Sequence, residues 1–235
     1  MASQFQDLHV VVSGGTGALG AAVVARLLDH GAICHIPCFQ ESELDNFPYR
    51  HHDRVRITHP VDLTQEDQVT EFYANLPRLW ASVHCAGGFA MSEISETSFA
   101  DFRHMMSMNA ESCFLCCREA VRAIRRSDTG GRIVNVAARP ALEARSGASM
   151  VAYTASKSAV AAITLALSEE VADEGIWVNA VAPSIIDTPA NRQAMPDADH
   201  GRWPSVEALA ASLVFLASPD NRSTRSAILP VYGRS

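Results

Sequence analysis

Short apolar runs alternate with longer amphipathic stretches along this chain, and the alternation predicts strands and helices in turn. The runs expected to form strands lie at residues 10–12, 33–39, 54–61, 79–83, 131–136, 176–181 and 227–232. The stretches expected to form helices lie at residues 21–29, 98–126, 158–172 and 206–217, with a further helix that Thr64 would cap. Such alternation favours a parallel sheet covered on both faces, with ligands at the carboxyl ends of the strands. We therefore predict a doubly wound α/β fold, as a single domain over residues 1–235.

Composition restricts the possible partners. The 235 residues are 48% hydrophobic, which is enough to bury the core of one domain. The net charge of −7 comes from mixed acidic and basic residues, which argues against nucleic acid or an anionic membrane as the main partner. The chain has no run of about eighteen apolar residues to span a membrane, and its first residues lack the pattern of a signal peptide. We expect a cytoplasmic protein that binds neither nucleic acid nor membrane.

Three of the six cysteines raise the question of a metal site. Cys113, Cys116 and Cys117 can share one face of a helix, with His104 upstream, and sulfur and imidazole are zinc ligands. The sequence shows no second paired cluster of such ligands, and several of the cysteines lie in apolar runs, as buried free thiols do. We therefore predict buried structural thiols and no metal.

A glycine-rich turn follows the first predicted strand. The strand leads into Ser13-Gly14-Gly15-Thr16-Gly17-Ala18-Leu19-Gly20, and a helical pattern begins directly afterwards. Glycines such as Gly14 and Gly17 let the backbone approach phosphate groups, and the start of a helix favours an anion. The order of strand, glycine turn and helix predicts a dinucleotide site. Ala86 and Gly87 follow the fourth strand, where small residues let another part of the ligand approach.

The choice between NAD and NADP is left open by the sequence. The acid that usually binds the ribose of NAD is expected at the end of the second strand. Cys38, Phe39 and Gln40 occupy that place, so neither a carboxylate nor an arginine is available there. We therefore expect the two reduced cofactors to differ by less than about tenfold in dissociation constant.

Tyr153 and Lys157 form the strongest catalytic signal. Positions four apart lie on one face of a helix, so the hydroxyl and the ammonium can serve one site. Lys157 is also the only lysine in the chain, and it offers a compact point charge that arginine does not. Lowering a tyrosine pKa from about 10 to roughly 7 takes about 4 kcal/mol. One cation about 4 Å away supplies about that much at an effective dielectric of about 20.

Together these motifs resemble the short-chain dehydrogenase/reductase family over essentially the whole chain. The resemblance is carried, in order, by the glycine turn, Asp62-Leu63, Ala86-Gly87, Asn109, Tyr153 with Lys157, and the segment from Pro183 to Thr188. It implies a Rossmann-type sheet of seven strands, a homodimer or homotetramer, and NAD or NADP as cofactor. The implied reaction is hydride transfer between that cofactor and a small carbonyl or alcohol.

The resemblance also implies roles for individual residues. Tyr153 would be the general acid/base, Lys157 would lower its pKa and hold the nicotinamide ribose, and Asn109 would anchor a water that relays protons. The remaining positions would line the cofactor: Thr16 and Leu19 along the phosphates, Asp62 and Leu63 near the adenine, and Ile186 and Thr188 at the nicotinamide amide. Residues 191–204 are polar and contain proline, and we expect them to form a mobile loop over the site.

One departure from the family pattern affects the chemistry. The family's catalytic serine, which hydrogen-bonds the substrate oxygen, aligns with Ala138, while Ser146 and Ser149 lie out of register in the following loop. Losing one donor to a developing oxyanion costs roughly 10²–10³ in rate. Three interpretations remain: an oxidoreductase of carbonyls or alcohols, a reductase like the dihydropteridine reductases, which resemble this chain in having alanine there, or a nucleotide-binding sensor or scaffold that barely turns over.

Overall fold

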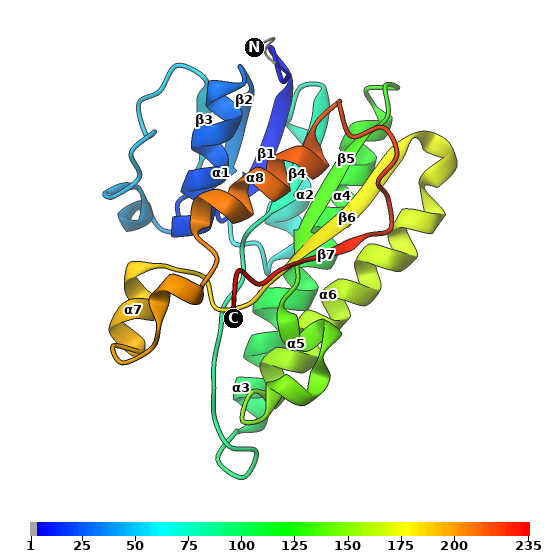
Figure 1. Cartoon of the computed structure of the whole chain (residues 1–235). Coiled ribbons are helices and arrows are strands. Elements are labelled where there is room, and N and C mark those ends of the chain that lie inside the picture. The colour runs from blue at the N-terminus through cyan, green and yellow to red at the C-terminus, as the bar shows by residue number, and fades with distance from the viewer. Residues whose placement is uncertain (1–3) are drawn as a thin grey trace.

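A computed structural model describes residues 4–235 and contains one seven-stranded sheet (Figure 1). The strand order is β3-β2-β1-β4-β5-β6-β7, and all six neighbouring pairs are parallel. The strands are β1 (His9–Ser13), β2 (Ile33–Pro37), β3 (Val55–Thr58), β4 (Leu79–His84), β5 (Gly131–Val136), β6 (Ile176–Pro183) and β7 (Ile228–Val231). The predicted doubly wound parallel sheet is therefore confirmed, and the strand order reverses between β1 and β4.

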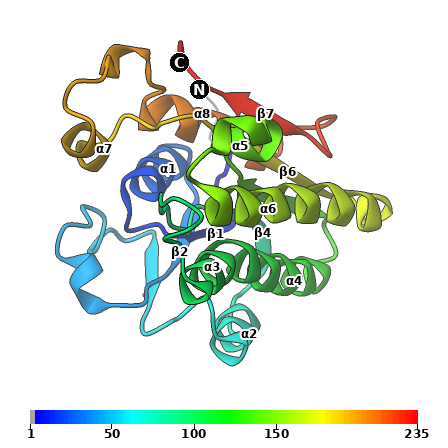
Figure 2. The same cartoon turned by 90° about the horizontal axis from the view of Figure 1, so that it is seen from below.

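The described residues contain eight α-helices, of which five cover the two faces of the sheet. The eight helices are α1 (Ala18–Asp29), α2 (Glu66–Ala74), α3 (Phe99–Met105), α4 (Ser112–Arg125), α5 (Arg139–Leu142), α6 (Val151–Glu170), α7 (Pro189–Ala194) and α8 (Val206–Ala217). Helices α1 and α8 pack on one face and α2, α4 and α6 on the other (Figure 2). The two faces thus support two separate apolar clusters, one on each side of the strands.

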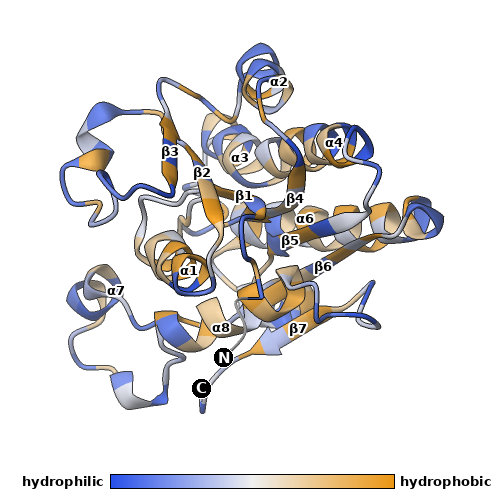
Figure 3. Ribbon diagram, turned by 90° about the horizontal axis from the view of Figure 1, so that it is seen from above, coloured by the Kyte–Doolittle hydropathy of each residue, from blue (hydrophilic) through white to orange (hydrophobic). Residues whose placement is uncertain are grey.

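Strand β1 shows why the apolar runs in the sequence are continuous. Val10 and Val12 are buried in the cluster beneath α1 and α8, whereas Val11 is buried in the cluster beneath α2, α4 and α6. Successive side chains of a strand point to opposite faces, and both faces here exclude water, so the middle positions, Val10 to Val12, are all apolar. The hydropathy colouring of the sheet in Figure 3 is therefore largely orange, although β4 and β5 also contain the buried polar residues Ser82, Arg132 and Asn135.

Helix α6 carries the predicted catalytic pair within the folded domain. By length and composition, among residues 4–235, α6 alone would suffice to cross a membrane. The core helix of a globular domain can have the same length and apolar composition. The buried side chains of α6 include Ser156, Lys157 and Thr164, which hydrogen-bond to other parts of the domain or to the helix itself. Its position against strand β6 is that of a core helix.

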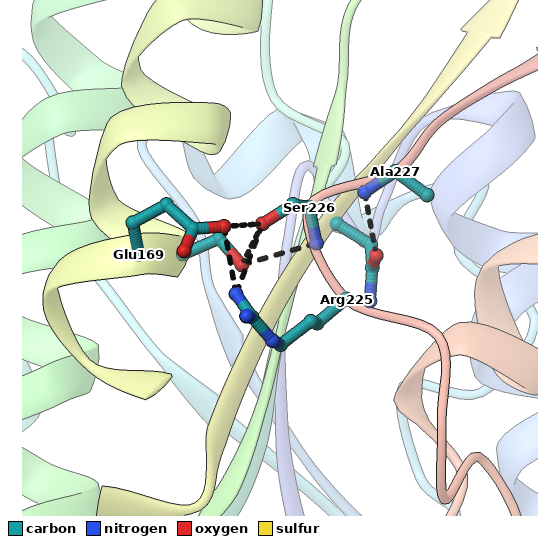
Figure 4. Close-up of polar contacts among 6 residues, drawn as sticks. Glu169, Arg225, Ser226 and Ala227 are labelled. Carbon is teal, nitrogen blue, oxygen red and sulfur yellow. Dashed lines mark hydrogen bonds and ion pairs between the residues drawn. The ribbon is translucent and has the colours of Figure 1, made fainter. Parts of the chain in front are cut away.

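The C-terminal end of α6 is hydrogen-bonded to the segment that precedes β7. The Glu169 carboxylate accepts hydrogen bonds from Arg225 (2.7 Å) and from the Ser226 hydroxyl (2.7 Å), as Figure 4 shows. The amide of Ala227 donates to the side chain of Asn179 in β6 (3.0 Å). These contacts fix the last strand of the sheet against the helix that bears Tyr153.

Several predicted bounds differ from the structure. Helix α1 begins at Ala18 rather than at residue 21, because the end of the glycine turn forms the first helical turn. Thr64 does not cap α2. Its amide and hydroxyl both donate to the Asp62 carboxylate, and Gln65 takes the cap position instead. The stretch predicted as a loop at residues 191–204 contains part of α7, tied by a bidentate ion pair between Arg192 and Asp187.

Candidate active site

The glycine turn lies directly against the end of β4. Gly14 has a φ of +65°, and a Cβ there would lie 2.7 Å from the backbone nitrogen of Ala86, so only glycine permits this approach. Gly17 caps α1 with its backbone alone. Among residues 4–235, no side chain caps this helix, and its first turn holds no acidic residue. The first N–H groups of α1 thus remain available to a phosphate, and the turn fits the pyrophosphate of a dinucleotide.

Asn109 connects the end of β4 to α6. It is buried within a π-helical segment, Met106–Glu111, that joins α3 to α4 and interrupts the long helix predicted at residues 98–126. Its Oδ1 accepts from the Gly88 amide (3.0 Å), while its Nδ2 donates to the Gly88 carbonyl (3.0 Å) and to Ser156 Oγ (3.1 Å). The expectation that a buried asparagine finds partners is confirmed. Such π-segments are frequent at functional sites.

Lys157 lies beside these residues, with its ammonium buried. Lys157 Nζ donates to the carbonyl of Val136 at 2.9 Å. Burial lowers the pKa of Lys157 to about 8, and the nearby thiols of Cys113 and Cys85 oppose that shift. At Gly87, a Cβ would lie 2.5 Å from Asn109 Oδ1 and 3.2 Å from Lys157 Nζ, so the missing side chain leaves room for both.

Tyr153 stands one helical turn before Lys157 on α6, as the sequence predicts. Its ring packs edge-on against Phe89, with centroids 5.0 Å apart. Burial raises the pKa of Tyr153 to about 12, and this is opposite in direction to the expected lowering toward 7. The reason is that desolvation disfavours the phenolate, while the Lys157 ammonium is engaged with Val136. The residues of this chain alone therefore do not prepare a tyrosine that ionises near neutrality.

Ala138 and the two loop serines occupy different environments. Ala138 is buried at the position that precedes α5, with an extended backbone. Ser146 is exposed, and its hydroxyl donates to the Glu143 carbonyl (2.8 Å). Ser149 instead lines a cavity of about 280 Å³ together with Ala90 and Ala152, the sequence neighbours of Phe89 and Tyr153. Of the two serines, Ser149 is the one that lines this cavity, whose lining does not include Tyr153, Lys157 or Ala138.

A carboxylate that sequence reasoning missed lies next to the glycine turn. Glu43 accepts hydrogen bonds from Thr16 Oγ1 (2.8 Å) and from the Gln40 amide (3.0 Å). Glu43 comes six residues after the last residue of β2, within a short 3₁₀ helix, Glu41–Leu44. Gln40 and Glu43 cap each other reciprocally there, and the turn places the Glu43 carboxylate beside Thr16. The available signal was that spacing, since a Glu three residues after a capping residue commonly closes on it.

The other predicted cofactor residues gather at the same edge of the sheet. Asp62 and Leu63 come after β3, and the Asp62 carboxylate accepts from Thr64. Pro183 ends β6. Beyond it, the Ile186 carbonyl accepts from Asn191 Nδ2 (2.8 Å), and Thr188 Oγ1 accepts from the Asn191 amide (3.2 Å) and caps α7. All of them follow the carboxyl ends of parallel strands, where a doubly wound sheet binds its ligand.

Comparison with known proteins identifies the family. The model of the short chain dehydrogenase family matches residues 8–199. The chain belongs to the short-chain dehydrogenase/reductase family. The 3beta-hydroxysteroid dehydrogenase of Mediterraneibacter gnavus is 34% identical over 202 residues, which are 83% of this chain and 71% of that protein. The galactitol 2-dehydrogenase of Rhizobium johnstonii is 31% identical over 228 residues, 89% of this chain and 88% of that protein.

Solved structures show the same fold. ElxO with NADP bound superposes with a TM-score of 0.86 at 24% sequence identity, covering 97% of this chain and 98% of that one. A short-chain type dehydrogenase/reductase from Mycobacterium ulcerans gives a TM-score of 0.88 at 24% identity, covering 100% of this chain and 90% of that one. This short-chain dehydrogenase/reductase is accordingly an NAD(P)-dependent oxidoreductase.

Proposed function

We propose that this short-chain dehydrogenase/reductase transfers a hydride between NAD(P)(H) and a small carbonyl or alcohol, with Tyr153 as the general acid and base. The observation that carries the proposal is the convergence of α6, β4 and β5 on one point. Lys157 is held by the end of β5, and Asn109 holds Gly88 and Ser156 together. A hydroxyl and a buried ammonium one helical turn apart, beside a glycine turn suited to a pyrophosphate, match a proton donor next to a nicotinamide site.

Different residues of the chain would bind the phosphates and the ribose of the cofactor. When bound, the nicotinamide cofactor supplies or accepts the hydride. The uncapped start of α1 and the turn at Gly14 and Gly17 would hold the phosphates, and the small residues Ala86 and Gly87 leave room at the end of β4. Lys157 would hold a ribose hydroxyl and place a positive charge near the Tyr153 oxygen. That charge favours the ionised phenol, against the desolvation that raises the pKa of Tyr153.

The surroundings of Tyr153 favour a substrate with an apolar body. Phe89 packs on the tyrosine ring and is itself exposed, as are Met91 and Val151 nearby in the chain. Relatives of this chain are named for a hydroxysteroid, a butanediol and galactitol, which are alcohols of very different size. These names support the carbonyl or alcohol class and leave the individual substrate to experiment.

Ala138 favours a second candidate. A buried methyl group stands where the family places its oxyanion donor, and it offers no hydrogen bond to a substrate oxygen. A conjugated imine or quinonoid substrate develops less charge on oxygen, so a reductase of the dihydropteridine type needs that donor less. This candidate shares Tyr153, Lys157 and the cofactor site with the first.

We also propose that the protein is a cytoplasmic homodimer or homotetramer that binds neither nucleic acid nor membrane. Phe114 on α4 and Leu165 on α6 are exposed apolar side chains on neighbouring helices, and a second copy would cover them. Light scattering of the purified protein tests this. A monomer at micromolar concentration would contradict the proposed assembly without affecting the proposed reaction.

Steady-state cofactor oxidation tests the proposed reaction. The purified chain is assayed with NADH and NADPH against a panel of diketones, aliphatic and cyclic ketones, and a quinonoid dihydropterin. Turnover of ketones supports the first candidate, and turnover restricted to the dihydropterin supports the second. Cofactor binding by fluorescence with no turnover across the panel would contradict both and leave the sensor or scaffold interpretation.

A further inference from the structure

A cluster of three metal-ligand side chains lies behind the proposed active site. His84 ends β4, and Cys113 and Cys117 stand one turn apart on α4. All three side chains are buried, and one potential ligand atom from each lies within 4.8 Å of the other two. None of the three has a role in the proposed hydride transfer.

The spacing of these atoms fits a tetrahedral metal. The Sγ atoms of Cys113 and Cys117 are 4.0 Å apart, and Cys117 Sγ lies 3.7 Å from His84 Nδ1. Zinc binds sulfur at about 2.3 Å and imidazole nitrogen at about 2.0–2.1 Å, so tetrahedral ligands lie about 3.8 Å apart for two sulfurs and about 3.5 Å for sulfur and nitrogen. The two distances that involve Cys117 Sγ are thus within a few tenths of an ångström of the tetrahedral values, and the third pair, Cys113 and His84, lies within 4.8 Å.

The neighbours of the cluster complete the arrangement. His84 Nε2 lies 2.8 Å from Ser82 Oγ and 3.4 Å from the Tyr73 hydroxyl, so the far nitrogen of the ring already has partners. Such outer partners fix the tautomer and orientation of a ligating histidine. On the near side, Asn135 Oδ1 accepts from His84 Nδ1 (2.8 Å) and from Cys117 Sγ (3.5 Å), so binding an ion requires the His84 proton to move from Nδ1 to Nε2.

We propose that His84, Cys113 and Cys117 bind a thiophilic divalent metal ion, Zn²⁺, with Asn135 Oδ1 or a water as the fourth ligand. Each ligating thiol releases its proton to solvent, and the proton of His84 moves from Nδ1 to Nε2, where Ser82 Oγ can accept its hydrogen bond. The two thiolates then neutralise the dication. Because the bound unit is then neutral, it adds no net charge beside Lys157. Asn135 immediately precedes Val136, whose carbonyl holds Lys157, so the ion would join β4, β5 and α4 behind the catalytic lysine.

The structure selects ligands that differ from those considered on the sequence. His104 is exposed, and Cys116 is not part of the cluster. The histidine comes instead from the neighbouring strand, far from the cysteines along the chain. The cluster also differs from an ordinary buried thiol pair, since two sulfurs and an imidazole nitrogen face one point.

Metal titration of the full-length protein tests the proposal. The protein is stripped with a chelator, kept reduced so that Cys113 and Cys117 stay thiols, and titrated with Co²⁺ and then Zn²⁺. We expect one ion per chain, cobalt absorption bands typical of tetrahedral thiolate ligation, their loss on adding Zn²⁺, and a higher melting temperature with Zn²⁺.

Variants of His84 and Cys117 test whether these side chains are the zinc ligands. Cys117→Ser and His84→Gln should weaken Zn²⁺ binding by more than the roughly 10–100-fold that loss of an outer partner costs. The control Cys116→Ser, on the same buried face of α4, should bind as the parent does. Absence of a thiolate band in the parent, which does not depend on the folding of any variant, would overturn the proposal. So would Zn²⁺ binding that survives unchanged in folded Cys117→Ser. Neither result bears on hydride transfer.

Discussion

The ammonium of Lys157 donates a hydrogen bond to the backbone carbonyl of Val136 across 2.9 Å, and this contact joins α6 to the last residue of β5. The lysine is thereby held as a fixed point charge at the carboxyl edge of the sheet, one helical turn from Tyr153. The contact also directs the ammonium toward the strand, while burial keeps the pKa of Tyr153 high.

Replacing Lys157 with arginine should abolish turnover while the fold survives. A guanidinium is planar and larger, so it cannot occupy the buried space of a compact ammonium and keep the same contact with the Val136 carbonyl. Circular dichroism checks the fold, and steady-state kinetics check the rate. Activity within about threefold of the parent would contradict the role of a point charge next to Tyr153.

The pH dependence of stability should reveal the buried lysine. The pKa of Lys157 falls to about 8 in the folded protein from about 10.4 in an unfolded chain. The unfolded state therefore binds more protons between these values, and the penalty for burying the ammonium, fully present below pH 8, is relieved as the pH rises toward 10.4.

Denaturant titration with a chelator present, comparing the parent with Lys157→Met, isolates this effect. The free energy of unfolding of the parent should rise relative to that of the variant by roughly 3 kcal/mol between pH 8 and 10.5. A constant difference between the two proteins across that interval would show that Lys157 is not desolvated.

Glu43 should make the protein prefer NADH to NADPH. Its carboxylate lies at the junction of the glycine turn and the end of β2, where it can accept from a ribose hydroxyl and repel a 2′-phosphate. We therefore replace the sequence-based expectation of a less than tenfold difference with a preference for NADH above tenfold, or about 1.4 kcal/mol.

The matched variants for this prediction are Glu43→Gln and Glu41→Gln. Glu41 lies in the same short turn but pairs with Arg50 (3.6 Å) rather than with Thr16. Fluorescence titration should show that Glu43→Gln narrows the difference between the cofactors and that Glu41→Gln leaves it unchanged. A parent that binds NADPH more tightly would refute the role of Glu43.

Ala138→Ser should increase activity toward activated ketones. The added hydroxyl supplies a donor near the developing oxyanion, worth up to roughly 3 kcal/mol, less the cost of its own desolvation. The affinity for cofactor should stay the same. Ser146→Ala serves as the control, because the Ser146 hydroxyl is exposed and bonded to Glu143. A loss of 10²-fold or more in Ser149→Ala, combined with no gain in Ala138→Ser, would mean that Ser149 is the donor.

The sequence predicted the fold because short, mainly apolar runs such as Val10 to Val12 alternate with longer helical stretches. The helical spacing of Tyr153 and Lys157 and the strand–turn–helix order around Gly14 could be recognised from local sequence, whereas the place of Asn109 came from the family resemblance. The sequence did not predict contacts between segments that are far apart along the chain. The Gln40–Glu43 turn returns a carboxylate to Thr16, and β4 places His84 against α4. Neither distance follows from local spacing.

Deuterium transfer tests the central claim most directly. The parent and Tyr153→Phe are each mixed with NADH that carries deuterium at both C4 positions of the nicotinamide and with a ketone turned over by the parent. The product is then analysed by mass spectrometry. We predict that the parent delivers the label to the carbonyl carbon. We predict that Tyr153→Phe binds NADH equally well but delivers the label at least roughly 10²-fold more slowly, since it lacks the proton donor. Product without deuterium, or label transfer by Tyr153→Phe within threefold of the parent, would contradict hydride transfer assisted by Tyr153.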